Sequence, residues 1–392
     1  MRILRILPSI DPANGGPVEG AIKSAELFRA LGHSTTISTF DSVEARFSTP
    51  GICHAPLGRG IGKYGFNPRA TTRIRDLAAD HDVSIIHGLW QYHTMAAHHA
   101  LVGRYPYIIF PHGMLDPWFN RTYPIKAIKK NIYWRLGDYR AIRDASAVCF
   151  TTETERLLAR TSFRPYCARE FIVNYGTTAP PKLSPLHRTA FLGTCPQAQV
   201  RPYLLFLSRI QSKKGCDMLI RAFATIAHLK PSLLLIIAGP DQEGWTKELK
   251  AIAESTGIGN RILWPGMLTG DAKWGAFYGA EAFCLPSHQE NFGIAVAEAL
   301  ACGLPVLISD QVNIWKEVTE YGAGYADRDT LDGTIKLLSR WMKTTNSERE
   351  SMGKAAALTF ISRFEIHRAC SSLLALLEDV IKGHLPPIWS KT

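Results

Sequence analysis

Short apolar segments recur along the chain, and polar segments with a helical period separate them. In the first half they span residues 2–9, 34–39, 83–88, 106–110, 146–150 and 171–174. In the second half they span residues 203–208, 233–239, 261–266, 282–286, 305–310 and 323–327. Segments of this length, rich in Ile, Leu and Val, are typical of strands that are buried on both faces of a sheet.

The segments between these strands have the periodicity of helices. Residues 18–32, for example, place Ala21, Ala25 and the stretch from Leu27 to Leu31 on one apolar stripe. Alternation of strand and helix predicts parallel sheets with right-handed crossovers. Because this alternation occurs twice, the expected fold class is α/β, with two doubly wound Rossmann-like domains. Ligands of such sheets bind beyond the carboxyl ends of the strands, so we expect the site in a cleft that the two domains face.

The domain boundaries follow from composition. Residues 176–202 are rich in Pro, Gly and polar side chains, which predicts a linker. The N-terminal domain is then expected at 1–175 and the C-terminal domain at 203–365, and a C-terminal helix within 366–392 is expected to pack back on the first domain. The length of 392 residues suits two such domains.

Composition narrows the class of protein. No window approaches about 20 apolar residues, so no membrane-spanning helix is expected. Asp11 ends the first apolar run early, which favours a buried first strand over a signal peptide. The eight cysteines are scattered without a CxxC pair, which favours free thiols in the cytoplasm over disulfides or a zinc site.

Charge indicates an anionic partner. The net charge is +11, and residues 1–180 hold 22 Lys and Arg against 14 Asp and Glu. A nucleotide or an anionic lipid surface would suit this excess. Nucleic acid is not expected as a partner, because the chain has no zinc finger, aromatic RNA-binding motif or long basic block.

Residues 123–136 predict a basic amphipathic helix. Its apolar stripe consists of Ile125, Ile128, Ile132 and Leu136, and its flanks carry Lys126, Lys129, Lys130 and Trp134. Such a helix can lie on the inner face of an anionic membrane and make the protein peripheral. The alternative is a helix whose stripe faces the core and whose basic face is solvated.

The most informative segment is 287–305, where a buried strand leads into a polar loop and then a helix. The first helix amides, at Gly293, Ile294 and Ala295, lack acceptors within the helix and form an anion site. Glu290 precedes the helix and can accept sugar hydroxyls, and Glu298 can chelate the diol of a ribose. Taken singly, each glutamate could equally be a capping acid or a solvated helix residue.

Two glutamates separated by seven residues, with Phe292-Gly293 between them, resemble the mark of glycosyltransferase family 4, a GT-B family of retaining enzymes. The resemblance extends over almost the entire chain. In the segment 207–220, Arg209 and Lys214 match the family's Arg and Lys, which implies that they bind the donor diphosphate and stabilise it as it leaves. Fixed cations at a leaving group that gains negative charge do lower the barrier.

Other segments resemble the family less closely. The turn at 238–240 and the segment 261–268 match regions near the nucleotide, which implies that the backbone at Met267 meets the base. Gly15 and Gly16 match a loop near the reacting centre. Pro17 departs from the family pattern there and removes one amide donor, so only the two glycines are carried over.

Candidates for sugar contacts lie after strands of the first domain. His112 matches the family histidine beside the anomeric carbon of the donor sugar. Asp116, Trp90 and Trp118 are candidates for acceptor binding, through a carboxylate and stacking rings. A turn cap and core packing are the alternatives for these three.

The resemblance implies transfer of a hexose-type sugar, with retention, from a UDP- or GDP-linked donor to a sugar or lipid-linked glycan acceptor in surface polysaccharide or glycoconjugate assembly. It implies a front-face mechanism with no cofactor. No DxD-like acidic pair follows a strand, which favours metal independence. The alternatives are a nucleotide-sugar epimerase or hydrolase and a non-catalytic binding protein. The set Arg209, Lys214, Glu290 and Glu298 disfavours the last.

Overall fold

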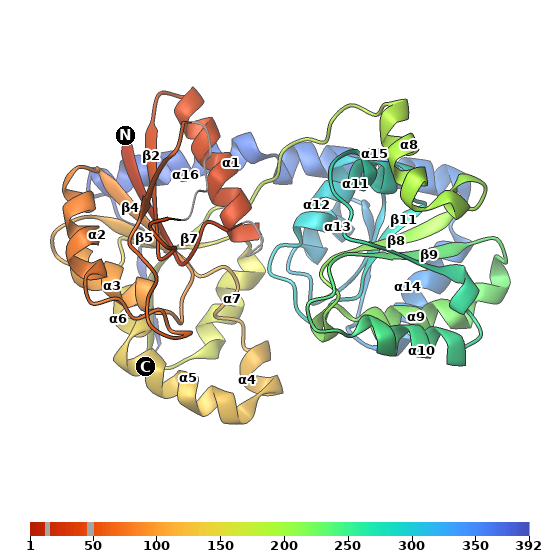
Figure 1. Cartoon of the computed structure of the whole chain (residues 1–392), viewed down its shortest axis with the longest axis horizontal. Coiled ribbons are helices and arrows are strands. Elements are labelled where there is room, and N and C mark those ends of the chain that lie inside the picture. Colours follow the sequence, from red (N-terminus) through yellow and green to blue (C-terminus); the bar gives the residue numbers. More distant parts are fainter. Residues whose placement is uncertain (12–15, 45–50, 392) are drawn as a thin grey trace. The chain divides into compact units, whose positions relative to one another are not determined.

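The computed structural model describes residues 1–11, 16–44 and 51–391. The chain divides into two compact units, one formed by Met1–Gly176 with Ile366–Thr392 and the other by Thr177–Glu365. Each unit is built on a largely parallel sheet with helices packed against it (Figure 1). The fold class expected from the strand and helix alternation is therefore confirmed.

The first unit contains an eight-stranded sheet in the order β14-β7-β6-β5-β4-β1-β2-β3. Neighbouring strands are parallel except β14 and β7, which are antiparallel. The strands are β1 (Arg2–Leu7), β2 (Ser34–Thr39), β3 (Cys53–Pro56), β4 (Val83–His87), β5 (Tyr107–Phe110), β6 (Ala147–Phe150), β7 (Tyr166–Ile172) and β14 (Ile388–Lys391). β3 and β14 lack an apolar run, and the sequence pattern did not predict them.

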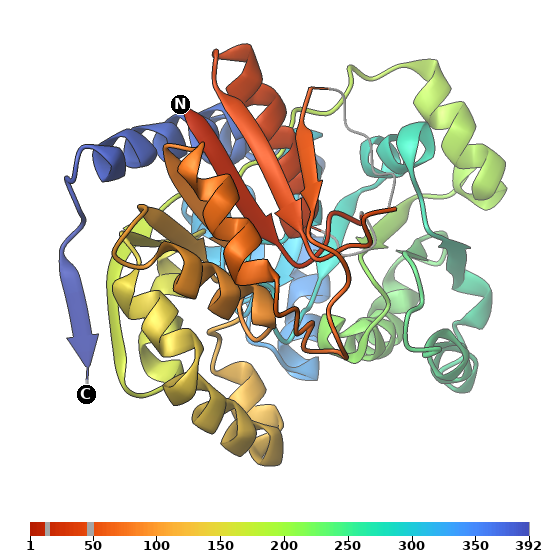
Figure 2. The ribbon, with the colours of Figure 1, turned by 60° about the vertical axis from the view of Figure 1, so that its left-hand side comes forward.

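Helices cover both faces of this sheet (Figures 1 and 2). Leu4 and Ile6 of β1 belong to one core cluster, which includes residues of α2, α3 and α6, whereas Ile3 belongs to a second cluster with residues of α1 and α16. This two-residue alternation places both faces of β1 against helices. The helices are α1 (Gly16–Ala30), α2 (Ala70–Ala79), α3 (Tyr92–Leu101), α4 (Trp118–Thr122), α5 (Pro124–Leu136), α6 (Asp138–Asp144), α7 (Glu153–Ser162) and α16 (Ile366–Ile381).

The last helix of the chain completes the core of the first unit. Leu373, Leu377 and Val380 of α16 are buried in the cluster that contains Ile3 of β1 and Ile108 of β5. Residues 366–392 thus return to the sheet with which the chain began.

The second unit contains a six-stranded parallel sheet in the order β10-β9-β8-β11-β12-β13. The strands are β8 (Tyr203–Leu207), β9 (Leu234–Ala238), β10 (Ile262–Gly266), β11 (Ala282–Leu285), β12 (Val306–Ser309) and β13 (Gly324–Asp327). The helices are α8 (Pro185–Thr194), α9 (Cys216–Ile226), α10 (Thr246–Ser255), α11 (Gly270–Gly279), α12 (Ile294–Ala301), α13 (Trp315–Glu320), α14 (Leu331–Lys343) and α15 (Asn346–Thr359). Short helical turns are η2 (Pro196–Gln199), η3 (Ser212–Lys214), η4 (Ala227–Leu229), η5 (Gly259–Arg261) and η6 (Phe360–Phe364).

The segment expected as a linker, 176–202, contains α8 and η2 and lies almost entirely in the second unit. Phe191 of α8 is buried, and α8 packs on α11. The two helices approach closely because Gly275 has no side chain: a Cβ there would lie 2.0 Å from the carbonyl oxygen of His187. Proline at the start of α8 follows the preference for the first helical turn, so the composition that predicted a linker also suits a helix N-terminus.

None of the described helices combines the length and the apolar content that crossing a membrane requires.

Candidate functional site

An ion pair between Lys214 and Glu290 joins two loops of the second unit. Lys214 ends η3, which follows β8, and Glu290 lies between β11 and α12. The strands β8 and β11 are parallel neighbours, so both loops lie at the carboxyl edge of the sheet. Lys214 is only 3% exposed, and its Nζ contacts Oε2 of Glu290. The structure thus brings together two residues that lie 76 positions apart in the sequence.

Backbone contacts hold the two loops against each other. The amide of His288 and the hydroxyl of Ser287 both donate to the carbonyl of Lys213, at 2.8 and 3.0 Å. Gly215 has φ +68°, and a Cβ there would lie 2.1 Å from the carbonyl oxygen of Pro286. Only glycine allows this approach, so Gly215 is what lets the lysine loop reach the glutamate loop.

The charge around Glu290 favours its carboxylate form. Burial alone would raise its pKa, but the nearby cations Lys214, Lys213 and Arg209 hold the pKa of Glu290 below its ordinary value. Arg209 itself is exposed, so its guanidinium is open to a ligand. The loop after β8 therefore presents the exposed Arg209, the half-buried Lys213 and the buried Lys214 beside an ionised carboxylate.

The N-terminus of α12 lies directly after this carboxylate. The amides of Val296 and Ala297 donate to the carbonyl of Gly293, at 2.8 and 3.1 Å, so the amides before them have no acceptor in the helix. These are the amides of Ile294 and Ala295, whereas Gly293, the third residue expected there, is the N-cap. Gly293 has φ +80°, and a Cβ there would lie 3.3 Å from Cγ of Glu290. The helix terminus and the glutamate are therefore packed as one structure.

Glu298 has a partner that sequence reasoning missed. It is buried on α12, and its Oε1 lies 2.6 Å from Nζ of Lys273 on α11. The lysine also lies over the ring of Trp274, 4.3 Å from the ring centre. No local pattern links Lys273 to Glu298, because the two helices meet only in the tertiary structure.

Two strand-end turns lie in the same unit. Gly239, with φ +144°, follows β9, and a Cβ there would lie 1.7 Å from the carbonyl oxygen of Ser208. The amide of Gly239 donates to the carbonyl of Gly266 at 2.8 Å. Met267 follows directly and is 66% exposed. The turn at Gly239 thus contacts both the Arg209 loop and the residue before Met267.

His112 of the first unit is held in an unusual backbone conformation. It follows β5 with φ +52°, and its ring stacks on that of His87 with a spacing of 5.2 Å. Its Nε2 lies 2.9 Å from Nδ1 of His87. Glu155 secures the turn, because its buried carboxylate accepts the amide of Gly113 at 2.6 Å and the amide of Thr151 at 2.7 Å.

Sequence reasoning missed Glu155. It is the third residue of α7, after the N-cap Thr152, so by its position it reads as an ordinary capping acid. The structure instead places its carboxylate beside the turn that carries His112.

Burial makes His112 a neutral ring. Burial, with a smaller contribution from the positive charge of Arg5, lowers the pKa of His112 to about 4. The imidazole is therefore uncharged at neutral pH and can accept or donate a hydrogen bond.

The glycine turn at the start of α1 is only partly described. Gly15 lies outside the described residues. Gly16 is the first residue of α1, and its carbonyl accepts a hydrogen bond from the hydroxyl of Tyr175 at 2.6 Å.

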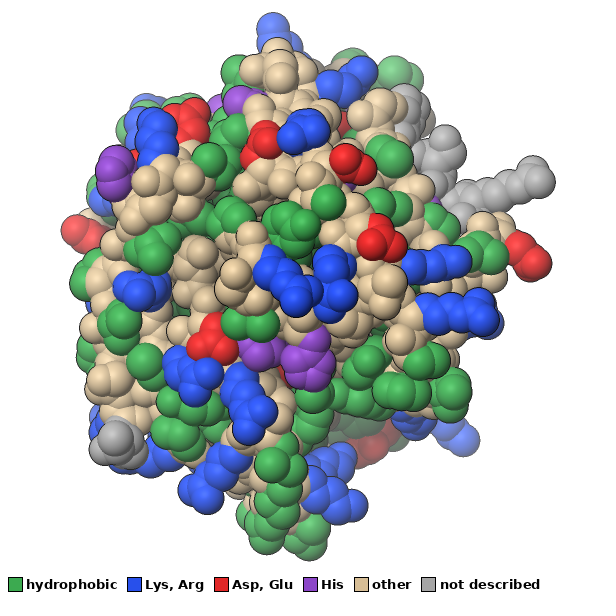
Figure 3. Space-filling view, turned by 90° about the vertical axis from the view of Figure 1, so that its left-hand side faces the viewer, with side chains coloured by type: hydrophobic (Ala, Val, Ile, Leu, Met, Phe, Trp, Pro, Cys, Tyr) green, Lys and Arg blue, Asp and Glu red, His purple; other side chains and the backbone are tan. Residues whose placement is uncertain are grey.

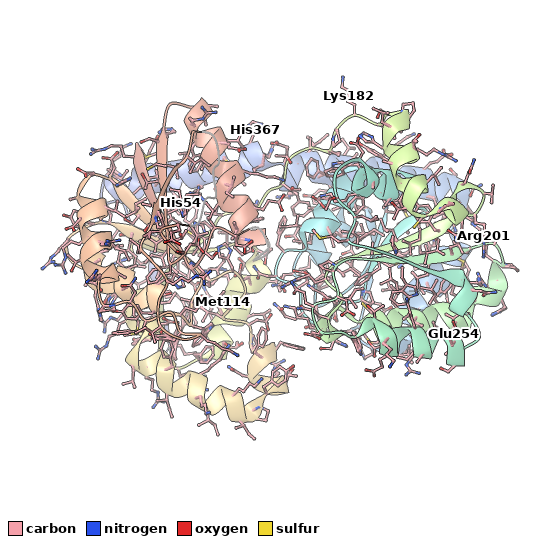
Figure 4. The ribbon with its side chains drawn as sticks, viewed as in Figure 1. His54, Met114, Lys182, Arg201, Glu254 and His367 are labelled. Carbon is pink, nitrogen blue, oxygen red and sulfur yellow. The ribbon has the colours of Figure 1, made fainter. Side chains whose placement is uncertain are left out.

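The three acceptor candidates have structural contacts. The amide of Trp90 donates to Asp138 at 2.7 Å, and its indole donates to the carbonyl of Met114, which Figure 4 labels, at 3.1 Å. Asp116 accepts the amide of Trp118 at 2.8 Å, which is the turn cap considered as the alternative. The ring of Trp118 is half-buried and contacts the rings of Phe119 and Tyr123. The ring of Trp90 packs against those of Tyr133, Trp134 and Phe163, which is the core packing considered as its alternative.

The apolar stripe of α5 faces solvent. Trp134, expected at the flank of the stripe, is instead fully buried and donates to the carbonyl of Pro165 at 2.7 Å, so that expectation is wrong. Lys130 lies over the ring of Trp90 at 4.6 Å and faces the core. The exposed members, at 58–78%, are Ile125, Ile128, Ile132 and Leu136. In Figure 3, hydrophobic side chains lie beside Lys and Arg side chains at the lower edge of the molecule, where Figure 1 places α4 and α5.

The described residues include no group of three or more His, Cys, Asp and Glu side chains arranged to hold a metal ion.

Comparisons with known proteins identify the family. The family described as "Glycosyl transferases group 1" matches residues 196–359, and "Glycosyl transferase 4-like domain" matches residues 15–174. The chain belongs to the glycosyltransferases of the family 4 type. It is 35% identical over 123 residues to a D-inositol 3-phosphate glycosyltransferase of Actinosynnema mirum, covering 30% of this chain and 29% of the relative.

A second relative of the same name, from Kribbella flavida, is 30% identical over 235 residues, 56% of this chain and 54% of the relative. The matched segments thus span between less than a third and about half of the length of these relatives.

Solved structures support the fold. The structure of HepE from Anabaena in complex with UDP and glucose has a TM-score of 0.76 at 18% identity, covering 97% of this chain and all of that one. Sucrose-phosphate synthase from Thermosynechococcus elongatus has the same TM-score at 16% identity, covering 97% and 99%. At these identities the likeness shows the fold, which is GT-B.

We expect the Lys214–Glu290 pair to be strongly coupled in stability. Lys214→Met leaves a partly buried carboxylate without its cation, so thermal unfolding should occur at a lower temperature than in the wild type. Adding Glu290→Gln to Lys214→Met should recover part of the loss, because the double variant has no unpaired charge. A double-mutant cycle measured by calorimetry checks this, and additive effects of the two substitutions would contradict the coupling.

Proposed function

We propose that this chain is a retaining glycosyltransferase that moves a hexose-type sugar from a nucleoside-diphosphate donor to a sugar or lipid-linked glycan. The observation that carries the proposal is the Lys214–Glu290 pair beside the open amides of α12, with the exposed Arg209 on the same loop. UDP is the favoured nucleotide, because HepE, which has the same fold, has been solved with UDP and with UDP-glucose. The relatives named for D-inositol 3-phosphate support an acceptor with sugar-like hydroxyls.

In the proposed reaction the bond between the anomeric carbon and the leaving diphosphate breaks, and the acceptor oxygen bonds to that carbon from the same face. The acceptor proton passes to the leaving phosphate oxygen. Arg209, Lys214 and the amides of Ile294 and Ala295 stabilise the charge that develops on the diphosphate. No protein nucleophile is required.

The carboxylates and His112 have binding roles in this proposal. Glu290, which is ionised beside its neighbouring cations, accepts hydrogen bonds from hydroxyls of the donor sugar. His112, neutral at pH 7, hydrogen bonds to the donor sugar without adding charge near the anomeric carbon. Glu298 accepts hydrogen bonds from the ribose hydroxyls, and its carboxylate also forms the ion pair with Lys273. Met267 provides backbone contact to the base.

Replacing either member of the Lys214–Glu290 pair should reduce turnover far more than donor affinity. Glu290→Gln and Lys214→Ala should each lower kcat by about two orders of magnitude or more, because a transition-state contact of about 3–4 kcal/mol is lost. Donor turnover with and without acceptor is the measurement, and Lys247→Ala on the exposed surface of α10 is the control. Folded variants with near-normal rates would contradict the assigned site, and equal turnover without acceptor would indicate a hydrolase or epimerase instead.

We propose that the reaction needs no divalent metal, since the cations Arg209 and Lys214 supply the positive charge at the diphosphate. Turnover should therefore be unchanged after incubation with EDTA. An activity that EDTA abolishes and that added Mn²⁺ or Mg²⁺ restores would overturn this part of the proposal, while leaving glycosyl transfer itself intact.

We further propose that α5 binds an anionic membrane surface, where a lipid-linked acceptor would be found. The support is the exposed apolar stripe, together with Lys126 and Lys129, which are also exposed. Apolar burial in the interface and attraction to anionic lipid would act together.

Lys126→Glu/Lys129→Glu should reduce co-sedimentation with anionic liposomes, since each basic residue near such a surface contributes about 1 kcal/mol. The matched control is Lys247→Glu/Lys250→Glu on α10, which changes the net charge equally. Wild-type binding should weaken as salt increases and should be low on neutral liposomes. If the wild type does not sediment with anionic liposomes at low salt, a soluble acceptor is the better proposal.

A further inference from the structure

The first unit contains a small pocket that shares only His112 with the residues of the proposed reaction. It has a volume of about 50 Å³ and is lined by residues of β1, α1, β4, the segment 173–176 and the start of α16. Its polar lining includes Arg5, His87, His112 and Tyr175. Since one water needs roughly 10–15 Å³, the pocket has room for a few waters or one small oxyanion.

Arg5 is a buried cation without a counter-ion among the described residues. It lies within β1 and is 1% exposed. Burial lowers its pKa to about 10, so the guanidinium remains charged at neutral pH. Its Nε and Nη2 have no hydrogen-bond partner in the described part of the chain. The contact of the guanidinium with the ring of Phe28, at 5.2 Å, offsets only part of the cost of burying the charge.

A second unpartnered nitrogen belongs to the same pocket wall. Nδ1 of His87 bonds to His112, but its Nε2 is buried without a partner among the residues described. The other walls are largely apolar, with Phe110, Val173 and Leu373. None of the described residues that line the pocket is an Asp or Glu, so it offers no carboxylate to a cation.

The unpartnered atoms of Arg5 suit an oxyanion. Nε and Nη2 lie on one edge of the guanidinium, and this edge donates two parallel hydrogen bonds to a carboxylate or phosphate. Both atoms are shielded from solvent, so the side chain has to turn toward the pocket as the anion enters. We propose that this pocket binds one small oxyanion, a phosphate or carboxylate group, paired with Arg5. The site goes beyond glycosyl transfer, and His112 belongs to both sites.

The test is binding of inorganic phosphate and of acetate to the full chain, without nucleotide sugar and at constant ionic strength. At least one of them should raise Tm with saturation, as binding to the native state requires, and chloride at the same concentration should not. Arg5→Met should weaken this binding at least tenfold. Arg2→Met is the control, because Arg2 lies on the same strand but is exposed and pairs with Asp82. If one of the two anions binds more tightly, its chemical class, phosphate or carboxylate, is assigned as the group that the pocket binds.

A second measurement tests the proposal even if the Arg5→Met variant fails to fold. Burial is the first cause of the low pKa of both His87 and His112, and the charge of Arg5 lowers both pKa values as well, so a bound anion should raise both when their rings are titrated by NMR. Arg5→Lys, which keeps the charge, should retain binding but more weakly than the wild type. The proposal is overturned if neither anion saturates, if chloride acts equally, if folded Arg5→Met binds as the wild type does, or if the histidines do not respond.

Discussion

The candidate site of the second unit depends on the ion pair between Lys214 and Glu290. A lysine this deeply buried needs an anionic partner, and the loop that follows the neighbouring strand supplies it in Glu290. The absence of a side chain at Gly215 allows that loop to approach, with the carbonyl of Pro286 where a Cβ would otherwise be. The pair in turn keeps Glu290 ionised at the start of α12, so the cations, the carboxylate and the helix amides share one edge of the sheet.

In the first unit, a buried carboxylate likewise holds a loop that carries a candidate site residue. His112 lies in a backbone conformation that few residues other than glycine adopt, and the hydrogen bond from Gly113 to Glu155 stabilises the turn. Burial then keeps the imidazole neutral, in contrast to the charged cluster of the second unit. A neutral donor or acceptor in one unit and a cationic edge in the other are what the proposed sugar and diphosphate contacts require.

The two charged features of the first unit differ in environment and therefore in chemistry. Lys126 and Lys129 of α5 are solvated beside an exposed apolar stripe, which suits a broad anionic surface. Arg5 is surrounded by apolar side chains and a small pocket, which suits one compact anion. The net positive charge of this half of the chain thus has at least two separate structural origins.

The sequence by itself determined the class of fold, the strands with apolar runs, and the placement of Arg209, Lys214 and Glu290 at strand ends, because these depend on local periodicity. The tertiary structure alone decided the partners. Lys273 reaches Glu298 across two helices, Glu155 reaches the His112 turn across 42 residues, and Trp134 enters the core from a helix whose stripe is exposed. Each of these depends on which elements pack side by side, and no local pattern in the chain carries that information.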